Sequence, residues 1–210
     1  MSDANPSVQF FERQFQRQVR EADFALNPFE TLALPWLRGE VLDLGCGLGN
    51  LSVAAARRGC RVTAIDASPT AIAHLRALAA AEALDLVAAQ TDLGAYRIDR
   101  DYDTIVAIGL LMFFPEARAK APLAEILAHV RPGGRVVLNV LVEGTSYLGM
   151  FTPGGHYLFG RDELTAYVAG WTIRVSRHDS FPAPENTSKV FHTLVAEKPA
   201  PSTPDSPKGG

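Results

Sequence analysis

Short, mostly apolar runs alternate with helical patterns through the middle of the chain. Runs typical of buried strands occupy residues 41–44, 61–65, 86–89, 103–108 and 135–142. Between them lie segments with cap residues, alanine-rich bodies or terminal glycines, which predict helices over 51–58, 68–83 and 118–130. Because strands and helices alternate, the pattern predicts a parallel sheet with helices on both of its faces.

Two further helices are predicted before the first strand. Apolar side chains that recur every three to four residues, with polar residues between them, predict an amphipathic helix at Val8, Phe11, Phe15 and Val19. Asn27 as a cap, Pro28 at the first helical position and Glu30 at the third predict a second helix. We expect it to run to about Leu37 and to stop at Gly39.

The last third of the chain departs from the alternation. After a short helix near 162–169, residues 172–176 and 190–196 have the pattern of two strands joined by a long loop, 177–189. Because no helix lies between these strands, they should pair antiparallel at one edge of the sheet. We therefore predict an α/β fold: a doubly wound, Rossmann-like sheet of seven strands, mostly parallel, with an antiparallel last strand.

Length and composition predict one globular domain. The 210 residues are 47% hydrophobic and 20% charged, which is ordinary for a domain with a single core. We expect this domain over residues 1–197, with its two N-terminal helices in residues 1–38. Residues 198–210, rich in Pro, Ser and Gly, are predicted to be a disordered tail.

Charge and cysteine content exclude several classes of function. The net charge of −3 and the scattered Lys and Arg residues argue against a nucleic-acid partner. Cys46 and Cys60 alone do not make a disulfide framework or a metal cluster, and no metal site is predicted. The sequence has neither a signal peptide nor an apolar run of membrane-spanning length, so we expect a cytoplasmic protein without a membrane partner. No feature indicates an oligomeric state.

The segment Asp43-Leu-Gly-Cys-Gly-Leu-Gly-Asn50 predicts a ligand-binding loop. Its three glycines permit backbone angles closed to other residues, and they let a ligand approach the main chain. The loop follows the carboxyl end of the first strand, where open α/β sheets place their ligands. The spacing fits the dinucleotide fingerprint poorly, because Asn50 stands where its third glycine belongs. Glycine-rich turns also occur without a ligand, so the loop alone leaves both interpretations open.

Two acids at the ends of the next strands favour the ligand site. Asp66 ends the second strand, where a carboxylate can accept hydrogen bonds from two ribose hydroxyls. Asp92 follows the third strand. A lone Asp at a strand end is more often a turn residue or a helix cap. Two acids on successive strands of one unit fit a binding site better.

Together with their neighbours, these residues resemble the motifs of a known family. The run from Val41 to Asn50 resembles the first signature of class I S-adenosylmethionine-dependent methyltransferases. Residues 103–109 and the turn Arg131-Pro-Gly-Gly134 are similar to the family's later motifs, and the resemblance covers about residues 38–142. Within the family, the run Leu111-Met-Phe-Phe114 after the fourth strand resembles the sequences of the small tellurite-resistance and thiol or thiopurine methyltransferases.

The resemblance implies S-adenosyl-L-methionine as the cofactor. It implies that Asp43 lies near the cofactor's ammonium, that Asp66 binds the ribose, and that Asp92 binds the adenine amino group. Backbone groups of glycines would line the methionine portion. The cofactor-binding residues expected on this basis are Asp43, Gly45, Cys46, Gly47, Asp66, Ala67, Asp92, Leu93, Ile108 and Gly109.

The acceptor side is expected from the N-terminal helices and from residues 143–159, a segment too long for an ordinary connection. Its His156 and Tyr147 are suited to deprotonating or orienting an acceptor, and packing over the sheet edge is the alternative role. No catalytic dyad is visible. We therefore expect a small-molecule acceptor that is already a good nucleophile, such as a thiol or chalcogen compound.

Three other functions remain open at this level. An NAD-dependent oxidoreductase would share the sheet and the ribose acid, but the glycine spacing and the antiparallel ending disfavour it. A binding module with a methyltransferase fold and no chemistry is the main alternative. Methylation of a protein or a nucleic acid is the third, and the net negative charge disfavours nucleic acid most.

Overall fold

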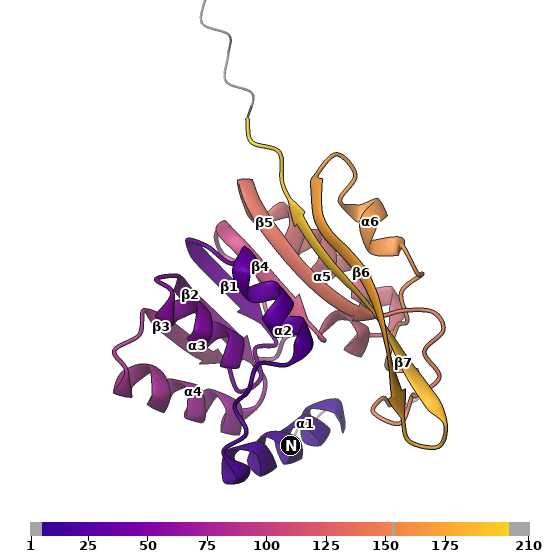
Figure 1. The fold of residues 1–210 in the computed structure, drawn as a ribbon, viewed down its shortest axis with the longest axis horizontal. Coiled ribbons are helices and arrows are strands. Elements are labelled where there is room, and N and C mark those ends of the chain that lie inside the picture. Colours follow the sequence, from indigo (N-terminus) through magenta and orange to yellow (C-terminus); the bar gives the residue numbers. More distant parts are fainter. Residues whose placement is uncertain (1–5, 153, 202–210) are drawn as a thin grey trace, which may run out of the picture.

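The computed structural model describes residues 6–152 and 154–201, and it confirms the predicted α/β fold (Figure 1). Its sheet has seven strands in the order β3-β2-β1-β4-β5-β7-β6. Strands β1 to β5 run parallel, and β7 pairs antiparallel with both β5 and β6. The strands are β1 (Glu40–Leu44), β2 (Arg61–Asp66), β3 (Leu86–Gln90), β4 (Tyr102–Ile108), β5 (Val130–Leu141), β6 (Thr172–Ala183) and β7 (Thr187–Glu197).

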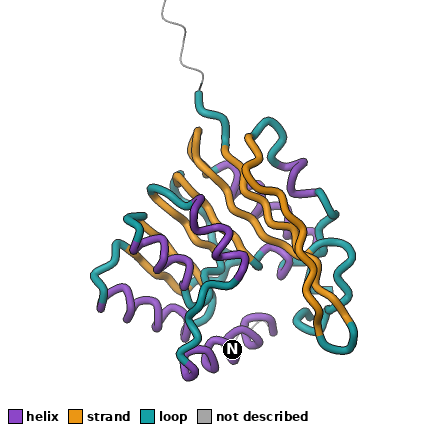
Figure 2. Tube along the Cα trace, viewed as in Figure 1, coloured by secondary structure: helices purple, strands orange, loops and turns teal. Residues whose placement is uncertain are grey.

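Helices cover both faces of the sheet (Figure 2). Buried side chains of α2 (Pro28–Ala33), α3 (Asn50–Arg57) and α4 (Pro69–Ala81) pack on one face. Those of α5 (Glu116–Ala128) and α6 (Glu163–Tyr167) pack on the other. Two short 3₁₀ turns, Leu34–Trp36 and Leu111–Phe113, complete the layers. Helix α1 (Pro6–Glu21) lies apart from both layers, across the carboxyl ends of the parallel strands (Figure 1).

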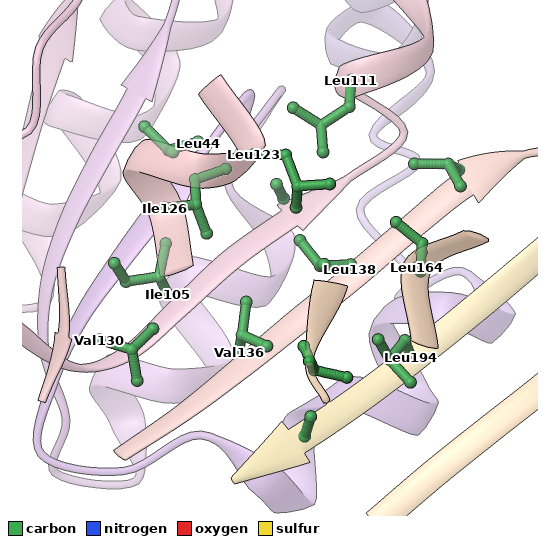
Figure 3. Close-up of a cluster of buried hydrophobic side chains, with 14 of the residues drawn as sticks. Leu44, Ile105, Leu111, Leu123, Ile126, Val130, Val136, Leu138, Leu164 and Leu194 are labelled. Atoms are coloured by element: carbon green, nitrogen blue, oxygen red, sulfur yellow. The ribbon is translucent and has the colours of Figure 1, made fainter. Parts of the chain in front are cut away.

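The core on the α5 face shows why the strands are nearly continuous apolar runs. Leu44, Ile105 and Leu138, from three neighbouring strands, face Leu123 and Ile126 of α5 (Figure 3). Alternate residues of the same strands point to the other face and join a second apolar cluster. Both faces are therefore buried, which fixes the register of the strands and the positions of their carboxyl ends.

The prediction of a long loop over 177–189 is wrong. Strands β6 and β7 continue through this region as a hairpin, and their pairing extends to Ala183 and Thr187. Glu185 and Asn186 have φ values of 59° and 55°, as a tight hairpin turn with right-handed twist requires. These strands cannot be recognised from the polar, proline-containing sequence. The hairpin projects past the sheet core, so it has no alternating apolar face.

The structure also revises the start of β5. Val130 already pairs with Tyr102 of β4, and the next paired residues are Thr104 and Arg135. The predicted turn 131–134 is therefore an irregularity within the strand, in which Gly133 has a φ of +75°. A chain that bulges in this way resumes its register without leaving the sheet.

Lys198, the first residue of the predicted tail, contacts the domain. The Lys198 ammonium donates hydrogen bonds to the carbonyls of Leu127, Ala128 and Val130, at the end of α5. A lysine in this position neutralises the negative end of the helix, so Lys198 belongs to the domain. Residues 202–210 of the predicted tail lie outside the described part of the chain.

Candidate functional site

A cavity of about 480 Å³ lies between α1 and the carboxyl ends of the parallel strands. This volume is within the usual range for small-molecule sites, and the position is the one where open α/β sheets bind ligands. Its wall includes residues of α1, the glycine loop, the segments that follow β2, β3 and β4, the loop 143–159 and strand β7. The site therefore collects residues that are far apart in the sequence.

The glycine loop forms part of the cavity wall, and its backbone has the left-handed conformation that favours glycine. Gly45, Gly47 and Gly49 have φ values of +72°, +55° and +76°. A Cβ on Gly49 would lie 2.5 Å from Cδ2 of Leu75, so helix α4 also requires a glycine there. A Cβ on Gly47 would lie 3.1 Å from Cζ of Phe15, which shows how closely α1 covers the loop.

Asp66 links the loop to the end of β2. One of its carboxylate oxygens accepts the Gly47 N–H at 2.9 Å, and the other accepts the Ser68 N–H at 2.8 Å. Burial raises the pKa of Asp66 above its usual value, although these backbone donors oppose the shift. A carboxylate offers about four acceptor positions, so Asp66 retains capacity for the hydroxyls of a ligand.

Asp43 and Glu30 make a second acidic group in the cavity wall. The Ser52 hydroxyl donates to Asp43 at 2.6 Å, and the Glu30 carboxylate accepts the Asn27 N–H at 2.8 Å as part of the predicted helix cap. Burial, with a smaller contribution from neighbouring carboxylates, raises the pKa of Asp43 to about 7. Burial likewise raises the pKa of Glu30. Buried carboxylates of this kind favour a bound cation, which would offset their desolvation.

Asp92 can serve both as a turn residue and as a ligand-binding acid, the two roles that its sequence position suggests. Its carboxylate accepts the Gly94 N–H at 2.9 Å, and its carbonyl accepts the N–H groups of Ala95 and Tyr96, so it organises the turn after β3. Asp92 and its neighbour Leu93 also line the cavity. Because Asp92 is exposed, its carboxylate has room for a further donor.

Helix α1 is held over the cavity by polar and aromatic contacts. The Glu12 carboxylate accepts the hydroxyls of Ser68 and Thr70, next to the loop that carries Asp66. The ring of Phe11 packs edge-on against Phe113 after β4, with ring centroids 5.1 Å apart. These contacts span the site, so α1 covers the cavity opposite the strand ends.

The far wall of the cavity contains Asn139, Tyr147 and Lys189. Asn139, at the end of β5, is fully buried, and its Nδ2 donates to Thr193 Oγ1 at 2.9 Å. Its Oδ1 has no hydrogen-bond partner among the described residues. The Lys189 ammonium lies 4.8 Å from the centroid of the Tyr147 ring, and the Tyr147 N–H donates to the Ser188 carbonyl of β7.

The structure brings together nearly all the predicted site residues. All ten expected cofactor-binding residues line the cavity, and so does Tyr147. His156 does not: its ring stacks on Phe151, with centroids 4.6 Å apart, and its Nδ1 is buried without a partner among the described residues. The geometry therefore does not support a role for His156 at the acceptor.

The cavity wall includes Glu30, Lys189 and Asn139, which the sequence does not predict as site residues. The sequence pattern indicates only a helix cap at Glu30 and a loop at Lys189. Asn139 is a polar residue at the carboxyl end of an apolar strand, and this position could have marked it as a candidate. Within residues 6–152 and 154–201, no helix is long and apolar enough to cross a membrane, and no three His, Cys, Asp or Glu residues are grouped to hold a metal ion.

Comparison with known proteins identifies relatives in sequence. A family described as "Methyltransferase domain" matches residues 41–134. The chain is 34% identical over 155 residues to "Hemagglutinin 1" of Eikenella corrodens, covering 74% of this chain and 48% of that protein. It is 31% identical over 166 residues to the "Probable S-adenosyl-L-methionine-dependent methyltransferase TehB" of Haemophilus influenzae, covering 76% of this chain and 57% of that protein. The chain thus spans about half the length of these curated relatives.

Solved structures share the fold. The crystal structure of TehB from Haemophilus influenzae superposes with a TM-score of 0.73 at 24% identity, covering 86% of this chain and 65% of that one. The N-methyltransferase NodS from Bradyrhizobium japonicum WM9, in complex with S-adenosyl-L-homocysteine, gives 0.68 at 19% identity and covers 93% and 100%. At these low sequence identities, the structural similarity shows that the fold is shared.

Proposed function

We propose that this chain is a class I methyltransferase that uses S-adenosylmethionine and transfers the cofactor's methyl group to a small molecule. One observation carries the proposal: Asp66 and the glycine loop form a single hydrogen-bonded unit that lines the cavity. The Asp66 carboxylate can accept hydrogen bonds from the two hydroxyls of a ribose, and the exposed main chain of the glycine loop lies beside it. Two similar proteins support it: TehB, a probable S-adenosyl-L-methionine-dependent methyltransferase, and NodS, which was solved with the demethylated cofactor.

The donor set of the cavity fits this cofactor. Asp66 would accept hydrogen bonds from the ribose hydroxyls, and the acids Asp43 and Glu30 would attract the ammonium of the methionine portion. Asp92 would accept the adenine amino group. The backbone of the loop and of Gly109 would line the methionine chain, while Ala67, Leu93, Cys46 and Ile108 would supply van der Waals contacts around the cofactor.

The chemistry requires alignment more than activation. When bound, S-adenosylmethionine supplies a methyl group on a positively charged sulfur. An acceptor with a free lone pair could take this methyl group directly: a carbon–nucleophile bond would form, the electron pair of the broken carbon–sulfur bond would stay with sulfur, and any proton on the acceptor would leave to solvent. The protein's part is to hold the two reactants in line, while α1 and the loop 143–159 exclude water.

A thiol or chalcogen compound is the acceptor we propose. Among the described residues, no histidine lines the cavity, so a histidine base is not at hand. A thiol, with a pKa of about 8.5, is partly ionised at neutral pH and needs little base catalysis. Met112, Met150 and several aromatic rings in the wall suit a soft, polarisable nucleophile. Tyr147, which lines the cavity, would orient the acceptor.

The test is a methyl-transfer assay with the purified full chain and methyl-labelled cofactor. The acceptor panel contains an aryl thiol, an alkyl thiol, selenite, a catechol, a primary amine and a carboxylic acid. We expect labelled thioether and one equivalent of S-adenosylhomocysteine per methyl transferred. Transfer only to the catechol, amine or acid would overturn the thiol assignment. Cofactor binding without any transfer would instead favour a binding module with no chemistry. Asp85→Asn, an exposed acid away from the cavity, is the charge-matched control for Asp66→Asn.

A further inference from the structure

We propose that the methyl acceptor is an organic anion, with an apolar or aromatic body and a carboxylate-type group bound by Lys189. The inference rests on the proposed function, because it takes the acidic part of the cavity to be the cofactor's. Three observations support it: the distribution of charge in the cavity, the alignment of side chains along β7, and the aromatic side chains that line the cavity.

Charges of opposite sign are separated across the cavity. Three of its acids, Asp43, Asp66 and Asp92, lie on or just after β1, β2 and β3, on one side of the strand order. Lys189 lies on β7, on the other side, and it is the one Lys or Arg among the described residues that line the cavity. A cationic methyl donor belongs with the acids, so an acceptor's anionic group finds its counter-charge at Lys189.

Lys189 is free to take this role. It is half-buried, and its ammonium lies against the face of Tyr147. No carboxylate of the described chain forms an ion pair with it, unlike Arg57, Arg61, Arg131 and Arg135, which each pair with a carboxylate. A partly desolvated ammonium without a counter-ion gains from binding an anion.

Residues of β7 extend from beside Asn139 to Lys189. Asn139 pairs with Thr193, so Thr193, Phe191 and Lys189 share one face of the strand and point to the same side as Asn139. Asn139 also neighbours Ile108 of β4, beside Gly109. Its unpartnered Oδ1 can accept a hydrogen bond from the acceptor's nucleophile.

The distance along this face favours an organic molecule over a small inorganic anion. Four residues of antiparallel strand separate Thr193 from Lys189, which corresponds to roughly 14 Å. A lysine side chain bridges less than half of that distance, so a ligand that meets both ends needs a body between its nucleophile and its charge. Phe191 lies between the two ends, and its ring is 4.7 Å from that of Phe29. On α1, Phe11 supplies a second aromatic surface.

The test measures binding of two matched aryl thiols to the full chain. The protein is first saturated with S-adenosylhomocysteine, and that step is recorded by calorimetry. The complex is then titrated with 4-mercaptobenzoate and with 4-mercaptobenzamide, which differ in charge but hardly in shape. We expect the carboxylate to bind about tenfold more tightly than the amide, which corresponds to about 1.4 kcal/mol.

Variants assign the preference to Lys189. Lys189→Met should abolish it while leaving the affinity for S-adenosylhomocysteine and the melting temperature unchanged, and Lys189→Arg should retain it. Lys120→Met, on α5 and outside the cavity wall, is the control and should behave as wild type. Equal or tighter binding of the amide, a preference that survives Lys189→Met, or no binding of either thiol to the saturated protein would overturn the inference. Failure of S-adenosylhomocysteine to bind in the first step would overturn the proposed function itself.

Discussion

Replacing Asp66 tests the ribose site most directly. The carboxylate keeps capacity for two hydroxyl donors beyond the Gly47 and Ser68 N–H groups that it already accepts. A hydrogen bond to a charged group contributes about 1.5 kcal/mol at the lower end of the usual range. Two such bonds give about 3 kcal/mol, so Asp66→Ala should weaken the binding of S-adenosylhomocysteine by roughly 150-fold.

Asp66→Asn should produce a smaller loss. The amide oxygen keeps one acceptor for a hydroxyl, but it is neutral and its NH₂ end cannot accept. About half of the free energy should remain, which corresponds to a loss of roughly tenfold. The order wild type, Asn, Ala therefore distinguishes a direct ligand contact from a general disturbance of the loop.

The assay is isothermal titration calorimetry at pH 7.5, with the melting temperature of each variant measured alongside. Asp66→Ala also leaves the Gly47 and Ser68 N–H groups without their acceptor, so its melting temperature should fall, whereas Asp66→Asn keeps an acceptor oxygen and should fall less. Asp85→Asn removes a charge at an exposed site and should leave the affinity unchanged. An affinity within about threefold of wild type in Asp66→Ala would refute the assignment of Asp66 to the ribose.

Three further predictions concern protonation and packing. Affinity for S-adenosylhomocysteine should fall by up to about tenfold per pH unit below pH 7, because burial raises the pKa of Asp43 to about 7 and protonation removes the charge that faces the ligand's ammonium. In Asp43→Asn this calorimetric pH dependence should be flat, and an unchanged slope would contradict the role. Burial lowers the pKa of His192 to about 4, so between pH 6.5 and 4 the unfolded chain binds a proton that the folded one does not, and stability falls as the pH drops. His192→Leu should lose about 2–3 kcal/mol less than wild type between pH 7 and 4.5 in urea denaturation, whereas equal losses would argue against a buried neutral histidine. Gly49→Ala should cost about 1–3 kcal/mol more than Gly59→Ala in the same assay, because both have positive φ but only the first Cβ would collide, with Leu75; equal costs would rule out the collision.

The sequence predicts the cofactor side of the cavity because its determinants are local. Each of Asp43, Asp66 and Asp92 lies at or just after the carboxyl end of a strand, and such ends are recognisable from apolar runs. Once the strands are parallel and adjacent, these residues must gather at one edge of the sheet. Their positions therefore follow from the order of the strands with little dependence on side-chain packing.

The acceptor side could not be derived in the same way. Lys189 reaches the cavity only because β6 and β7 continue as a hairpin past the sheet core, and the polar sequence of that hairpin resembles a loop. Asn139 depends on the hydrogen bond to Thr193 from an antiparallel neighbour, whose register is set by long-range pairing. Glu30 serves a helix cap and the cavity at once, and the cap alone explains its presence in the sequence.

A thermal shift of the wild-type protein shows whether the cavity binds S-adenosylmethionine. S-adenosylmethionine and S-adenosylhomocysteine, each at 100 times its dissociation constant, should stabilise the fold by about 2.7 kcal/mol. This corresponds to a rise in melting temperature of roughly 5–10 °C for a domain of this size. NAD at the same concentrations should cause no shift. Stabilisation by NAD alone, or by none of the three, would contradict the account.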